Sequence, residues 1–166
     1  MDVSDVFRKR NLKNVNFDYE NLIGKNLSDT FLSGVDLGGA DVHNSDFSGA
    51  DLSNANLRGG ILFNARFRGA DLRSSDLGKA KIWDADMYGA DMRGADLKGS
   101  DLFNTDLKSS DLSGADLSGA YLKNSDFTGA IMKNIEFLDT RYDKKTINTI
   151  TDDASKSQLK KQGILW

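Results

Sequence analysis

His43 is the only histidine in the chain and the residue best suited to acid–base chemistry at neutral pH. Asp41 and Ser45 lie close to it in sequence, and a serine, a histidine and an aspartate together can activate a serine nucleophile. Serine and aspartate recur throughout the chain, however, so nothing marks these two as catalytic. The chain has no cysteine, which excludes a cysteine nucleophile and a zinc–thiolate site. The sequence therefore predicts a protein that is not an enzyme.

The acidic residues are the second set with chemical potential. Asp accounts for 23 of them, and Glu20 and Glu136 are the only two glutamates. Paired carboxylates can act as acid and base, but in this chain the pairs arise from repetition and carry no such information. No set has the spacing of a calcium-binding loop. We expect the aspartates to bond nearby backbone amides at turns, and we expect no metal ion and no cofactor.

A period of five residues explains why the same types recur. Every fifth residue from Phe7 to Tyr142 is large and apolar, which makes 28 consecutive units. From Thr30 to Ala130 a small residue, mostly Ala or Ser, stands two positions before each of them. A short fixed period is typical of a solenoid. Side chains alternate in an extended chain, so the small and the large residue both point inward and the residues beside them point outward. The fifth residue, mostly Gly, Asn or Asp, turns a corner.

The number of sides in each coil follows from which units resemble one another. Asn at the corner position occurs only on two alternate sides of a four-sided coil, at positions 14, 44, 54, 64, 104, 124 and 134. Outward apolar residues are spaced by multiples of twenty at Ile23, Phe63, Trp83 and Phe103, with His43 filling the gap. A fifteen-residue coil would scatter these residues over different sides. The spacing therefore predicts four sides per coil.

The runs "ADLSGA" and "SDFTGA" resemble the pentapeptide-repeat proteins, whose pattern is A(D/N)LXX. The resemblance covers residues 11–142 and implies an all-β solenoid, a right-handed quadrilateral β-helix of about seven coils. We expect short helical caps at the two ends, over residues 1–10 and 143–166. The small-residue position holds Arg10, Glu20 and Lys25 near the start, which predicts a first coil that is irregular or open to solvent.

One side of the coil carries an unusual set of outward apolar residues. We call it the Trp83 side, residues 21–25 and each segment twenty residues further on. Its predicted protein-binding residues are a column, Ile23, His43, Phe63, Trp83 and Phe103, and a parallel column with Ile61 and Tyr121. Two interpretations remain open: the rings stack on one another and stabilise the coil, or the strip binds a partner.

The neighbouring side, which begins with residues 16–20, is the acidic side. Its outward residues carry seven acids against three cations, a net charge of −4. The predicted acidic column consists of Asp36, Asp76, Asp96, Asp116 and Glu136. The other acids are Asp18 and Asp139, and the cations are Arg58, Lys79 and Lys98.

Three functions follow from these surfaces. The first is a non-enzymatic interaction module that binds an unknown protein partner through the Trp83 side. The second rests on the family resemblance, which implies that some members are acidic mimics of DNA that protect or inhibit DNA gyrase, a type II topoisomerase. An enzyme or an enzyme accessory is the least favoured. The overall net charge of −3 predicts no direct binding of nucleic acid.

The C-terminal end carries apolar residues that predict self-association. We expect a tail-to-tail homodimer with contacts from Phe137, Leu138, Tyr142, Ile164, Leu165 and Trp166. Residues 1–30 lack a signal-peptide pattern, and no apolar run has the length to span a membrane. The sequence therefore predicts a cytoplasmic protein with no membrane partner.

Overall fold

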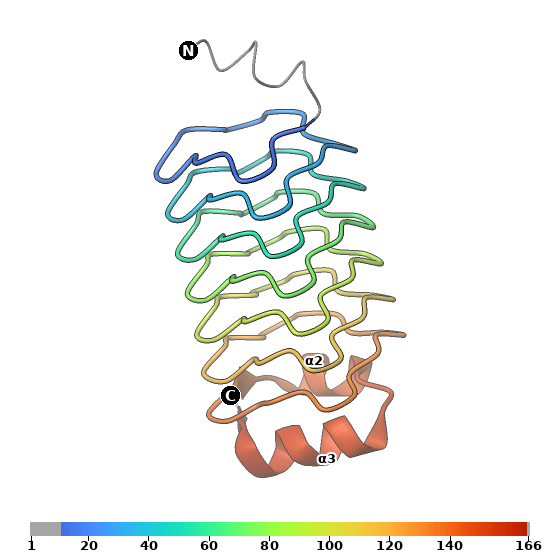
Figure 1. Ribbon diagram of the computed structural model, residues 1–166. Helices are drawn as coiled ribbons and strands as arrows, with labels where there is room; N and C mark the ends of the chain where they lie inside the picture. Colours follow the sequence, from blue (N-terminus) through green and yellow to red (C-terminus); the bar gives the residue numbers. More distant parts are fainter. Residues whose placement is uncertain (1–10, 166) are drawn as a thin grey trace.

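The chain winds into stacked coils that form a rod, with two helices at its C-terminal end (Figure 1). This computed structural model describes residues 11–165, so the predicted N-terminal cap over residues 1–10 lies outside the described residues, as does Trp166. No helix in the described part of the chain is long and apolar enough to cross a membrane.

Parallel pairing between residues twenty positions apart holds the coils together. The bridges run from Asn11↔Phe31 to Tyr121↔Arg141 without a change of register. Each side contributes hydrogen bonds in both directions: Leu97 N–H donates to Asp116 O at 2.8 Å, and Asp96 N–H donates to Ser75 O at 3.0 Å. The register confirms the twenty-residue coil that the outward apolar residues predict.

The corners lie where the pattern places Gly, Asn or Asp. Gly94 and Asn104 have φ values of 67° and 56°, in the left-handed region that these residues tolerate best. After each corner the chain folds back, so that Ala95 N–H donates to Met92 O at 3.0 Å. Four such corners close one coil.

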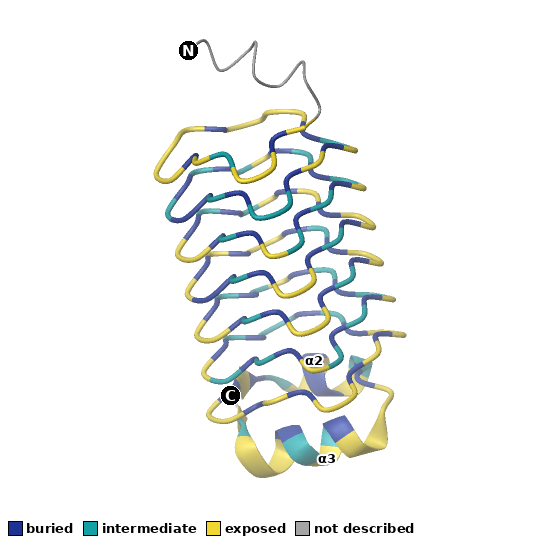
Figure 2. Ribbon diagram, in the orientation of Figure 1, coloured by how far each residue is buried: buried dark blue, intermediate teal, exposed yellow. Residues whose placement is uncertain are grey.

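The interior is filled by the large residue and the small residue of every unit. From Leu32 to Leu122 all of the large residues are at most 1% exposed (Figure 2). Phe47 and Phe67 stack one coil apart with ring centres 5.1 Å from each other. At Gly60 the small-residue position has no spare room, because a Cβ atom added there would lie 2.8 Å from Leu62 Cδ1 and 3.1 Å from Leu57 O. The predicted inward register is therefore confirmed.

The first described coil is less closed than the rest. Glu20 and Lys25 occupy inward positions but are exposed, and Val15 is half-buried. Charged side chains cannot enter an apolar interior without a partner, so they turn to solvent. This agrees with the expectation that the first coil is open.

The C-terminal segment contains two helices rather than the single short helix expected from the sequence. Strand β1 (Arg141–Tyr142) leads into α2 (Lys144–Thr149), which is followed by α3 (Asp153–Gln162) and β2 (Ile164–Leu165). β2 pairs with β1 in parallel, so it extends the sheet of the Trp83 side by one strand. The Asp143 and Asp152 side chains cap α2 and α3.

These helices bond to the last coil much as another coil would. Within the solenoid, Ser125 Oγ donates to Leu102 O at 2.7 Å. Thr146 Oγ1 of α2 makes the equivalent bond to Leu122 O at 2.6 Å, and Ser155 Oγ of α3 bonds to Met132 O at 2.8 Å. The helices thus satisfy carbonyl groups that the end of the solenoid would otherwise leave open.

Candidate interaction surface

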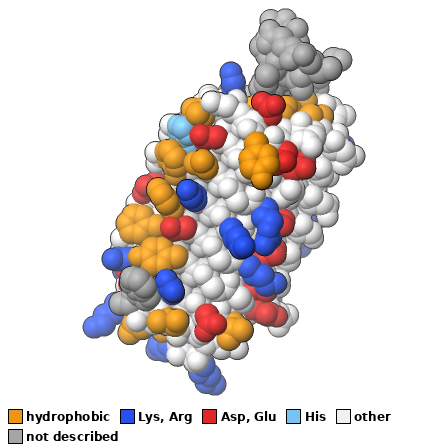
Figure 3. Space-filling model, turned by 90° about the vertical axis from the view of Figure 1, so that its left-hand side faces the viewer, with side chains coloured by type: hydrophobic (Ala, Val, Ile, Leu, Met, Phe, Trp, Pro, Cys, Tyr) orange, Lys and Arg blue, Asp and Glu red, His pale blue; other side chains and the backbone are white. Residues whose placement is uncertain are grey.

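The Trp83 column, made of Ile23, His43, Phe63, Trp83 and Phe103, runs along one side of the rod, and three of its rings stack on one another. The rings of His43 and Phe63 lie 4.4 Å apart at 12°, and those of Phe63 and Trp83 lie 6.2 Å apart at 20°. Trp83 is 38% exposed and Ile23 is 37% exposed, whereas His43, Phe63 and Phe103 are half-buried. Figure 3 shows large apolar side chains gathered along one edge of the molecule, beside a region of mixed charge.

His43 has a structural environment rather than a catalytic one. Its Nδ1 atom lies 2.7 Å from Asp41 Oδ1, which also accepts the His43 backbone N–H. Ser45 is fully buried, and its hydroxyl donates to Leu22 O at 2.6 Å. The serine therefore points into the solenoid while the histidine lies on its surface. The three residues do not form a nucleophilic triad.

The parallel column on this side is mixed. Ile61 and Tyr121 are half-buried, and Lys81 and Asp101 lie between them in the same column. The structure thus places all seven predicted protein-binding residues on one side, five of them as a continuous column.

The aspartates stabilise turns, as the sequence predicts. Asp96 Oδ1 accepts the Lys98 N–H at 2.9 Å, and Asp111 Oδ1 accepts the Ser113 N–H at 3.0 Å. The same bond recurs along every side of the coil. Among residues 11–165, no group of three or more His, Cys, Asp or Glu residues has the geometry to hold a metal ion.

The acidic column is in register but partly neutralised. Arg58 Nη1 lies 3.1 Å from Asp76 and 3.9 Å from Asp96, and Lys98 Nζ lies 2.8 Å from Asp116. Burial by itself raises the pKa of the Asp116 carboxyl, but hydrogen bonds from Lys98 and Ser118 hold that pKa below its usual value. The Asp36 carboxylate accepts a bond from Asn56 Nδ2 at 2.8 Å.

Comparison with known proteins identifies the repeat. The family profile for pentapeptide repeats matches eight copies, over residues 11–49, 50–82, 70–108 and 100–137. The chain belongs to the pentapeptide-repeat family.

Two solved structures share this fold. One trypsin-treated form of QnrB1, a plasmid-mediated fluoroquinolone resistance protein, has a TM-score of 0.62 at 17% identity and covers 91% of this chain and 94% of that chain. A second trypsin-treated form has a TM-score of 0.50 at 20% identity and covers 77% and 69%. The pentapeptide-repeat protein alr5209 from Nostoc PCC 7120 is 31% identical over 73% of this chain and 84% of its own, with a TM-score of 0.41. No curated protein sequence matches the chain.

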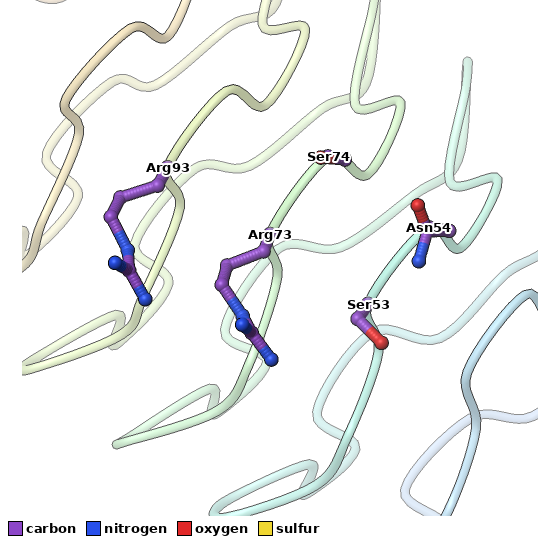
Figure 4. A pocket seen from close by; sticks show the side chains of 5 residues that line it. All are labelled: Ser53, Asn54, Arg73, Ser74 and Arg93. Atoms are coloured by element: carbon purple, nitrogen blue, oxygen red, sulfur yellow. The ribbon is translucent and has the colours of Figure 1, made fainter.

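The side of this pentapeptide-repeat solenoid that carries Arg73 holds a feature that the sequence analysis missed. Figure 4 shows Arg73 and Arg93 one coil apart at an open hollow, which is also lined by Ser53, Asn54 and Ser74. Each guanidinium makes two bonds to the aspartate two residues before it, and Arg93 does so to Asp91 at 2.8 and 2.6 Å. The signal was present in the sequence as D-x-R, at residues 71–73 and 91–93.

These ion pairs continue between coils. Arg73 Nε lies 3.8 Å from Asp91, and Arg93 Nε lies 3.9 Å from Asp111. Hydrogen bonds from Arg73 and Arg93 lower the pKa values of the Asp71 and Asp91 carboxyls, respectively. Positive and negative charges therefore alternate along this side, and the hollow has no cationic excess with which to hold an anion.

Two of the residues predicted to form the dimer contact at the C-terminal end are buried. Phe137 is 0% exposed and Tyr142 is 5% exposed, because both stand at the large inward position of the repeat. They cannot contact a second copy. Leu138, Ile164 and Leu165 are exposed, at 59%, 45% and 53%.

Proposed function

We propose that this pentapeptide-repeat protein is a non-catalytic interaction module that binds a protein partner through the Trp83 side. The observation that carries the proposal is the column of Ile23, His43, Phe63, Trp83 and Phe103, in which the rings of His43, Phe63 and Trp83 stack. Contiguous exposed apolar surface of this kind marks interaction sites more often than scattered apolar residues do.

The stack also prepares these side chains for binding. Phe63 lies against both His43 and Trp83, so its ring loses little further freedom when a partner covers it. Aromatic anchors that are rigid before association cost less entropy to bind. Self-stacking and partner binding are therefore compatible, and stacking makes the column a better anchor.

The test replaces Phe63, Trp83 and Phe103 by Ser, a residue that the repeat already carries at outward positions such as Ser113. A matched control replaces Phe31 and Tyr88, which are 53% and 41% exposed on other sides. Full-length protein and both variants are used for affinity capture, and captured proteins are identified by mass spectrometry and rebound in purified form. We expect the triple variant to lose the partner and the control to keep it. Retention of every partner by the triple variant would contradict the proposal.

The alternative function is an acidic DNA mimic that modulates or protects a type II topoisomerase such as DNA gyrase. The acidic column in register supports it, and the QnrB1 structures support only the shared fold. Arg58 and Lys98 pair with three of the five acids, which weakens the anionic surface. Replacing Asp36, Asp96 and Glu136 by amides should abolish any effect on gyrase supercoiling, chiefly at low salt. An effect that survives these changes would exclude the alternative.

We further propose a homodimer through the C-terminal end, with contacts from Leu138, Ile164 and Leu165. β2 is the last strand of its sheet, and such edges favour pairing. Light scattering on wild-type protein should show a dimer, and replacing the three residues by Ser should give a monomer. A wild-type chain that is monomeric at high concentration would end this part of the proposal.

A further inference from the structure

The two sides that border the Trp83 side share one sign of charge. The acidic side has a net charge of −4, as counted above. The opposite border, residues 26–30 and each segment twenty residues further on, has five acids and three cations, a net charge of −2. Its acids are Asp29, Asp46, Asp86, Asp106 and Asp126. Its cations Arg66, Arg68 and Lys108 pair with every one of these acids except Asp29, so the excess of negative charge on this border is small.

The Trp83 side between these borders is apolar and close to neutral. Over residues 21–125 its charged residues are Lys25, Lys81 and Lys123 against Asp41, Asp84 and Asp101, which gives no net charge. The Asp84 carboxylate accepts a bond from Asn104 Nδ2 at 2.6 Å, and Asp101 accepts the Phe103 N–H at 3.1 Å. Both donors are neutral, so these two bonds add no positive charge beside the rings.

We infer that the Trp83 side binds a basic amphipathic helix of a partner protein, an inference that rests on the proposed function. An apolar strip with negative charge on both borders complements a helix with an apolar stripe and lysines or arginines on both flanks. The same borders disfavour a second copy of this chain, because face-to-face packing would oppose negative sides whichever way the copy is turned.

The spacing of the column favours a helix over an extended segment. Successive coils are about 4.8 Å apart, so Ile23 and Phe103, four coils apart, are separated by about 19 Å. Seven residues of an α-helix rise about 10.5 Å, close to the height of two coils, and return the apolar stripe of the helix to the same face. Over the whole column the helix rise and the coil spacing then differ by about 2 Å. Same-face side chains of a strand are about 6.7 Å apart, so a strand along the column places about four of them against its five residues, and the inner ones fall out of line with the coils. A helix of about 13 residues spans the column.

The experiment uses the full chain and an 18-residue peptide with leucines on one stripe, lysines on both flanks and alanines elsewhere. One control peptide has glutamate in place of lysine, and the other has the same composition in scrambled order. Titration calorimetry gives the affinities at low and high salt, and circular dichroism follows the helix content of the peptide. We expect the lysine peptide to become helical and to bind at least about ten times more tightly than either control.

Two pairs of variants locate the binding. Replacing Phe63, Trp83 and Phe103 by Ser should weaken the lysine peptide by about ten-fold or more, and Phe31→Ser with Tyr88→Ser should not. Asp84→Asn with Asp101→Asn keeps the hydrogen-bonding oxygens and should weaken binding about three-fold at low salt, with no difference at high salt. The matched pair is Asp51→Asn with Asp111→Asn. Both residues lie on the Arg73 side, residues 11–15 and each segment twenty residues further on, so this pair should not change the affinity for the peptide. Denaturation midpoints confirm that all variants are folded.

The outcomes separate this inference from the proposed function. Equal binding of the lysine and glutamate peptides, or binding that ignores the three aromatic residues, overturns the helix assignment. The assignment also fails if no peptide binds while capture of a natural partner still depends on those residues, and the proposed function then stands. If neither capture nor peptide binding depends on them, both fail.

Discussion

The Trp83 side and the Arg73 side are opposite sides of the same coil, with the same backbone register and different outward chemistry. On the Arg73 side, Arg73 and Arg93 each pair with an aspartate of their own coil and with one of the next, so charge is balanced locally around them. On the Trp83 side rings stack in the equivalent positions and leave apolar surface exposed. The backbone ladder and the core hold both sides, which frees the outward positions to differ. The comparison indicates that the residues at these outward positions can differ in chemistry without a change in the backbone register.

The largest expected loss of stability comes from core substitutions, and it should be similar beneath both sides. Leu102 and Leu112 are 0% exposed beneath the Trp83 side and the Arg73 side, respectively. Each change to Ala should lower the free energy of unfolding by about 2–5 kcal/mol, because it leaves a cavity between stacked neighbours. Chemical denaturation measures both losses. Losses as small as those of outward substitutions would show that the inward register is wrong.

A smaller effect is expected from the stack itself. Phe63→Ser removes two ring contacts and should lower the free energy of unfolding by about 0.5–1.5 kcal/mol. The loss should be the same at low and high salt, since apolar contacts are not screened. A loss of several kcal/mol would instead make the column mainly a structural stack.

On the Arg73 side we expect a still smaller loss, and one that depends on salt. Arg93→Gln removes exposed ion pairs to Asp91 and Asp111, which are screened by solvent and by ions. At low ionic strength the unfolding midpoint should fall by less than it does for Phe63→Ser, and at high ionic strength it should match the wild type. A salt-independent loss would mean that Arg93 stabilises the coil by packing.

The smallest expected effect is a difference in pH dependence. Hydrogen bonds from Arg73 and Arg93 hold the pKa values of the Asp71 and Asp91 carboxyls below their usual value in the folded protein, so these groups bind protons less readily there than in the unfolded chain. Their stabilisation is therefore present above about pH 4 and is lost as the pH falls through the lowered values. Asp71→Asn with Asp91→Asn should flatten the acid limb of the stability curve. Asp51→Asn is the control, and an unchanged acid limb in the double variant would contradict the assignment.

Much of this molecule could be predicted from periodicity, because a five-residue repeat fixes which side chains point inward. The same rule shows why Phe137 and Tyr142 are not dimer contacts: they stand at the large inward position and are buried. The period does not predict which partners the long side chains of arginine and lysine bond. The bonds of Arg58 and Lys98 to the acidic column depend on rotamers that reach into the next coil, as do the longer contacts of Arg73 and Arg93 to Asp91 and Asp111. The second helix was missed because residues 143–166 follow no repeat, and α2 has only six residues.

The interior repeats every five residues, whereas each side of the surface recurs only every twenty. Five extra residues inserted at a corner would add another side with the same inward pattern, and the core would accept it. Every residue downstream would then move to the next side, so Ile23 and His43 would no longer lie in line with Trp83. Only insertions of a whole coil lengthen the rod and keep its sides distinct. The interior thus accepts insertions of five residues, whereas binding of a partner to one side survives only insertions of twenty.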